Sequence, residues 1–169
     1  MPRPLRLALA ALALAGFVLA LAVHAAAVCG VDASDHVPGV WWLHVGIFVV
    51  FFPYVFAMRK AVGQAGDWRQ AQKALVPAPL RQLGSALLTY AVLNFMWTML
   101  TLSHGSPAVV DGQYVLQNHG HVVGEITQAQ YAAGKAAQMR LFSGHWMAFY
   151  FLPFAFFGFA KRPADDRLA

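Results

Sequence analysis

The residues of this chain best suited to chemistry are four histidines, one within or directly beside each of its four most apolar stretches. They are His24, His44, His104 and His145. Imidazole is the commonest metal ligand in proteins and a usual axial ligand of haem iron. Because inward-facing side chains of neighbouring helices can meet around one cofactor, this pattern predicts a candidate haem or metal site at one end of a helical bundle.

Sulfur-containing residues predicted to lie on the same side of the membrane as these histidines make copper an alternative to haem as the bound cofactor. They are Cys29, Met99, Met139 and Met147. Thioether and thiolate groups favour copper, but none of these methionines forms a compact motif with a histidine. The simpler interpretation is that the histidines are structural, each satisfied by hydrogen bonds close to interfacial water. The metal is therefore unknown, and haem and copper both remain possible cofactors.

The third apolar stretch carries a row of polar side chains that belongs to the same prediction. Tyr90, Asn94, Trp97, Thr101 and His104 follow one another at helical spacing, so they share one narrow helix face. Polar groups in lipid turn toward protein or a water-filled cavity. Tyr90 and Asn94 are therefore added to the candidate site, with simple helix-to-helix hydrogen bonding as the alternative.

The sequence gives weaker indications of an enzyme or a transporter than of a cofactor site. The chain contains no HExxH, no GxSxG and no phosphate-binding loop. Ser103 precedes His104, but a catalytic triad is defined by geometry rather than by adjacency. Pro53 and Pro153 would each free a backbone carbonyl near mid-membrane, as in some transporters. We expect no enzyme activity and keep a small transporter as a third alternative.

These side chains have to be positioned by four long apolar segments. The segments lie at residues 6–28, 40–58, 83–103 and 141–160. Each is near the roughly 20 residues that cross a bilayer. The composition is 59% hydrophobic and 11% charged, against about 25% charged in soluble domains. The sequence predicts an all-α integral membrane protein, a four-transmembrane-helix bundle in one domain spanning residues 1–169.

The distribution of positive charge predicts the topology. Of the twelve Lys and Arg residues, only Lys135 and Arg140 fall opposite the other ten when the chain crosses the membrane four times. The positive-inside rule then places both termini and loop 59–82 in the cytoplasm, with loop 104–140 outside. A bacterial inner membrane fits this multi-pass pattern. One alternative stays open, that residues 1–27 are a cleaved signal peptide.

Two loops are predicted to be structured. Segments 114–117 and 121–126 flank Asn118-His119-Gly120 and read as a small extracytoplasmic β-hairpin. Thr127 and Gln130 form a capping box that starts a helix leading into the fourth span. Residues 68–75 place Trp68, Ala71 and Leu75 on one side of a short interfacial helix.

The partners expected from these features are membrane lipid and another membrane protein or a second copy of the chain. The basic residues flank apolar segments and form no groove, which excludes nucleic acid. The first hypothesis for function is a non-enzymatic accessory or scaffold subunit of a membrane complex. The competing hypothesis is a haem- or metal-binding redox module that uses the histidines.

Overall fold

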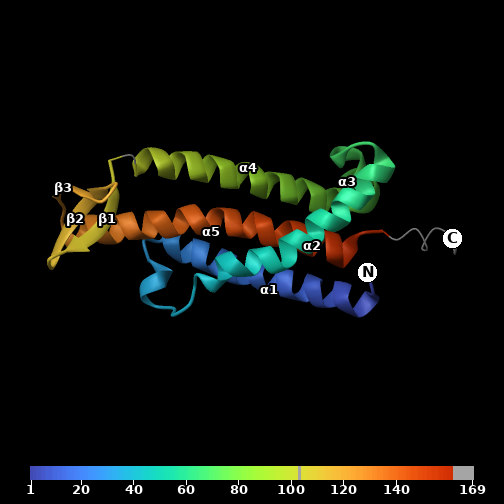
Figure 1. The fold of residues 1–169 in the computed structure, drawn as a ribbon, viewed down its shortest axis with the longest axis horizontal. Helices are drawn as coiled ribbons and strands as arrows, with labels where there is room; N and C mark the ends of the chain where they lie inside the picture. Colours follow the sequence, from blue (N-terminus) through green and yellow to red (C-terminus); the bar gives the residue numbers. More distant parts are fainter. Residues whose placement is uncertain (103, 162–169) are drawn as a thin grey trace.

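The computed structural model describes residues 1–102 and 104–161 and is mostly helical, with one small sheet (Figure 1). The helices are α1 (Arg3–Val28), the short 3-10 helix η1 (Ala33–Asp35), α2 (Trp42–Ala65), α3 (Trp68–Leu75), α4 (Ala78–Thr101) and α5 (Gln128–Phe159). The strands are β1 (Ser106–Val110), β2 (Gln113–Asn118) and β3 (His121–Glu125).

Helices α1, α2 and α4 are long and apolar enough to cross a membrane. The expected membrane character is therefore supported by three helices, and α5 is not among them. The helices α2 and α4 also extend past the predicted span limits into loop 59–82, because a helix continues beyond the bilayer until a capping residue or proline stops it. Pro53 and Pro153 lie inside α2 and α5 and end neither helix.

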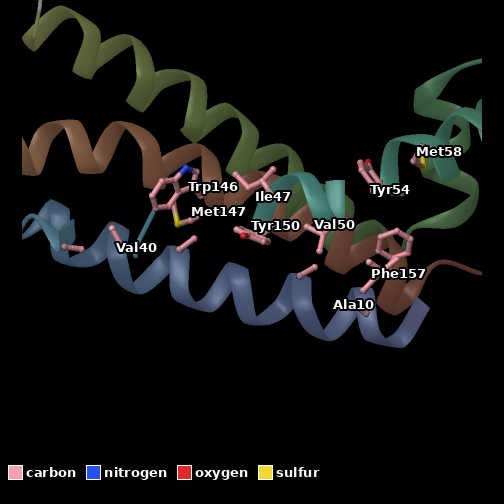
Figure 2. Packing of buried hydrophobic residues seen from close by; sticks show 14 of the residues in the cluster. Ala10, Val40, Ile47, Val50, Tyr54, Met58, Trp146, Met147, Tyr150 and Phe157 are labelled. Carbon is pink, nitrogen blue, oxygen red and sulfur yellow. The ribbon is translucent and has the colours of Figure 1, made fainter. Parts of the chain in front are cut away.

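Helix α5 is the axis of the fold. Figure 1 shows it between α4 and α1, with α2 packed on it as well. Buried side chains are spread over most of its circumference; they include Trp146, Met147, Tyr150, Phe151 and Phe157. Figure 2 shows several of these beside Val50, Tyr54 and Met58 of α2. Because the other helices cover α5, its environment is mainly protein rather than lipid.

Helix α1 lies against α5 through small residues. Ala13, Gly16 and Ala20 are buried there, and small side chains let two helix backbones approach closely. At the other end of this interface, Nε of Arg6 donates to the carbonyl of Phe157 at 2.7 Å and Nη1 donates to that of Ala160 at 3.4 Å. A cation at a helix C-terminus satisfies free carbonyls and complements the helix dipole.

The sheet is antiparallel in the order β1-β2-β3. The predicted hairpin is confirmed as β2 and β3, and His119 and Gly120 form its two-residue turn. Both residues have positive φ, as a type I′ turn requires. Strand β1 was not predicted, although it joins β2 through an Asp111-Gly112 turn of the same type.

The sheet packs on the start of α5. The capping box is confirmed: the Thr127 hydroxyl accepts from the backbone of Gln130, and the Gln130 side chain accepts from the backbone of Thr127. From there α5 continues without a break for 32 residues. The ring of Tyr114 stacks on Tyr131 with centroids 4.8 Å apart. The sheet therefore extends from the end of the bundle opposite α3 (Figure 1).

The predicted short helix at residues 68–75 is confirmed as α3, with Ala71 buried. Asp67 caps it by accepting from the backbone of Gln70 at 2.8 Å, and this hydrogen bond lowers the pKa of the Asp67 carboxyl. The ionised cap is therefore kept at neutral pH and lost only when the pH falls through that lowered value. The backbone of Lys161 donates to Leu75 at 3.0 Å, which joins α3 to the end of α5.

Candidate functional site

The four predicted histidines do not gather around one point. His24 lies among α1, α4 and α5, whereas His44 and His145 face each other between α2 and α5. His104 is exposed in the turn after α4. Within residues 1–102 and 104–161, no three His, Cys, Asp or Glu side chains are placed to hold a metal ion together. The arrangement is two clusters and one separate histidine.

His24 is fully engaged in hydrogen bonds. Its Nδ1 lies 2.9 Å from Oγ of Ser143, and its Nε2 lies 2.5 Å from the hydroxyl of Tyr90. Ser143 donates its own proton to the carbonyl of Met139 at 2.7 Å, so it accepts from Nδ1–H of His24. The Tyr90 hydroxyl then donates to Nε2. This neutral imidazole has no free lone pair for a metal, and it ties three helices together.

Asn94 and Thr98 extend this region along α4. Nδ2 of Asn94 donates to the backbone carbonyl of Arg140 at 3.0 Å, and Nη2 of Arg140 is 3.5 Å from Oγ1 of Thr98. Gly144 leaves the room for this contact, because a Cβ there would lie 2.5 Å from Nδ2 of Asn94. We call His24, Tyr90, Asn94, Thr98, Arg140 and Ser143 the polar cluster.

Sequence reasoning missed Thr98 and Arg140. Nε of Arg140 is the one buried side-chain nitrogen or oxygen in the described part of the chain that has no hydrogen-bond partner. A usable signal was present, because Arg140, Ser143 and Gly144 recur at i, i+3 and i+4 on one helix face. The cluster therefore contains a cation beside two candidate spans.

The predicted polar face of α4 is only partly the buried one. Asn94 is buried as expected, but Trp97 is 62% exposed and Thr101 is exposed. The buried side of α4 is instead Gly84, Ala91, Asn94 and Thr98. The physical reason is that α4 packs on α5 through one narrow strip of its surface. The buried residues follow one another at intervals of seven, three and four, and this spacing includes Thr98 but not Trp97.

The second cluster surrounds His44 and His145, whose ring centroids are 6.0 Å apart. Nε1 of Trp146 donates to Nδ1 of His44 at 2.9 Å, so a neutral His44 carries its proton on Nε2. Nδ1 of His145 donates to the carbonyl of Leu141 at 3.1 Å, which leaves a lone pair on Nε2. A histidine held to a backbone carbonyl in this way is oriented as metal-ligating histidines are.

An apolar groove of about 660 Å³ runs between α1 and α2. Its wall includes Gly16, Leu19, Leu43 and Gly46, and Tyr150 of α5 forms part of its floor. The Tyr150 hydroxyl is satisfied, because it donates to the carbonyl of Leu43 at 2.7 Å. A hydrocarbon chain matches this lining.

Comparison with protein-family models, curated proteins and solved structures finds no match to this chain. The function has to be argued from the geometry. Ser103, which precedes His104 in the one Ser-His pair considered above, lies outside the described residues. Cys29 is exposed and forms no disulfide.

Proposed function

We propose that this chain is a non-enzymatic accessory subunit of a membrane complex that receives a partner protein at strand β3. One observation carries the proposal: all five residues of β3 are exposed, and in the described part of the chain the strand pairs only with β2. An edge strand presents unpaired backbone groups to which an extended segment of another protein can add. Val122 and Val123 are 52% and 59% exposed on it, and they supply apolar contacts.

The membrane arrangement that goes with this function is four spans with both termini in the cytoplasm. Helix α5 is the fourth span, shielded from lipid by α1, α2 and α4, so it needs less hydropathy than they do. Arg69 and Lys73 belong to α3, and Arg59 and Arg81 belong to the ends of α2 and α4 that adjoin it in the chain. Helix α3 lies at the end of the molecule opposite the sheet (Figure 1). By the positive-inside rule that end is cytoplasmic, and the sheet is then extracytoplasmic in a bacterial inner membrane.

Site-specific cross-linking tests the docking strand. A photoreactive residue in place of Val123 is expected to give one discrete adduct in native membranes, since partner backbone would lie alongside β3. Adding Val122→Lys should reduce the adduct yield by about fivefold or more, because lysine blocks strand addition at an edge. Mass spectrometry of the adduct identifies the partner, and twice the chain mass would mean a second copy.

Val109 provides the matched control. It lies on β1, the other edge strand, and is also 52% exposed. The same photoreactive residue at position 109 should give no discrete adduct, and Val109→Lys should leave the yield from position 123 unchanged. Equal adducts from both positions, or none from position 123, would contradict docking at β3.

The free lone pair of His145 favours a second candidate, a haem- or metal-binding redox module. His145→Ala is then expected to abolish any Soret band or bound metal of the purified protein, because this imidazole would be the ligand. His104→Ala should retain it, because His104 is exposed and apart from both clusters. A folded preparation without visible absorbance or metal would remove this candidate.

A further inference from the structure

A basic cavity lies where α3 turns into α4. It measures about 480 Å³, and its walls are Arg69, Gln72, Lys73, Arg81, Gln82 and Ser85. All six side chains are polar and three are cationic. Val76, the C-cap of α3, and Pro77, the N-cap of α4, bring the two helices together here.

Among the described residues no salt bridge reaches these three cations, although the Asp67 carboxylate interacts electrostatically with Arg69. The salt bridge found within residues 1–102 and 104–161 joins Lys135, in the first turns of α5, to Asp32, the N-cap of η1. Nη1 of Arg81 donates to the carbonyl of Val76 at 3.3 Å, which holds the guanidinium beside the turn. Three converging cations of this kind attract an anionic group, and an Arg guanidinium can bind a phosphate through two parallel hydrogen bonds.

A second, apolar hollow lies further along α4. Its lining is Leu88, Thr89, Val92 and Leu93, and its volume is about 300 Å³. Residues at positions 81, 85, 88 and 92 share one helix face. This face therefore changes from cationic to apolar within a few residues of the α4 start, as the surface beside a lipid headgroup and its acyl chain would.

We propose that this face binds an anionic phospholipid. Its phosphate lies among Arg69, Lys73 and Arg81, and its acyl chain runs over Leu88 and Val92. A lipid is favoured over a soluble phosphate because the apolar hollow lies beyond the charged cavity on the same face of α4, a candidate membrane span. Orientation alone explains positive charge at this end of the molecule, but not its convergence on one cavity that shares a helix face with an apolar hollow.

Native mass spectrometry of the detergent-purified full chain tests the proposal. The probes are dioleoylphosphatidylglycerol and dioleoylphosphatidylcholine, which differ in headgroup charge but not in acyl chains. The anionic lipid is expected to bind at least about tenfold more tightly. Arg69→Gln with Lys73→Gln should weaken its binding by about 25-fold, roughly fivefold for each cation removed. This variant keeps Arg81 and its hydrogen bond, so the helical turn stays intact.

The control variant is Arg59→Gln with Lys60→Gln, which removes two cations of α2 that do not line the cavity. Its affinity for the anionic lipid should stay within about twofold of the parent. Equal binding of the two lipids, or an equal loss in both variants, would overturn the proposal. Glycerol phosphate is the third probe, and binding as tight as that of the lipid would show that the ligand is a soluble phosphate.

Discussion

Replacing Gly16 with alanine is expected to lower the free energy of unfolding by about 2 kcal/mol, the range of overpacked cores. A Cβ at this position would lie 2.2 Å from Cε1 of Tyr150, far inside van der Waals contact. The ring has little freedom to move away. It is buried, its hydroxyl donates to Leu43, and Gly46 already lies under that hydroxyl. Thermal unfolding in detergent measures the change.

The control substitution is Gly63→Ala, near the C-terminal end of α2. Nothing lies within 4 Å of the Cβ it would add. Since alanine has the higher helix propensity, this variant is expected to be as stable as the parent or up to about 1 kcal/mol more stable. If Gly16→Ala were equally harmless, α1 would not pack on α5, and the cleaved-signal interpretation of residues 1–27 would be favoured.

Features set by local sequence were predictable. The His119-Gly120 turn, the Thr127 capping box and helix α3 each depend on a few neighbouring residues, and each is found where the pattern placed it. The Asp111-Gly112 turn carried the same type I′ signal and would have predicted β1. Long apolar stretches likewise indicated the membrane, because lipid accepts an apolar surface that water does not.

Features set by packing between helices were not predictable from one sequence. That α5 is the central helix follows from which neighbours cover it, and its own residues do not specify those neighbours. The same limit applied to α4: the helical period allowed a face through Trp97, but contact with α5 selected Thr98. The predicted helix from the capping box into the fourth span does pass through Arg140, but its contact with Asn94 depends on how α4 and α5 pack.

The histidines illustrate the same limit for a site. One histidine per span near one end suggested a shared ligand set, since depth along the helices can be read from sequence. The rotation of each helix about its axis cannot be read from sequence. This rotation places His24 beside Ser143 but His44 beside Trp146. The predicted ligands thus come from similar positions along their helices, but their side chains point in different directions.

Among the residues of the second cluster, Trp146 is the one whose replacement is expected to lower the free energy of unfolding most. Its side chain is fully buried, its ring stacks edge-on with Trp41 at 5.7 Å between centroids, and its Nε1–H donates to His44. Trp146→Ala is expected to lower the free energy of unfolding by about 3 kcal/mol or more, because it leaves a cavity between α2 and α5. Trp146→Phe should cost about 1 kcal/mol, since it keeps most of the volume but removes the hydrogen bond.

Trp42→Ala is the matched control for that loss. Trp42 is 73% exposed, so its removal should change stability by no more than about 0.5 kcal/mol. Unfolding in detergent followed by circular dichroism compares the three variants. A similar loss for Trp42 and Trp146 would mean that α2 packs on α5 through a different face. In that case His44 would be free of its Trp146 bond, with Nδ1 available to a ligand.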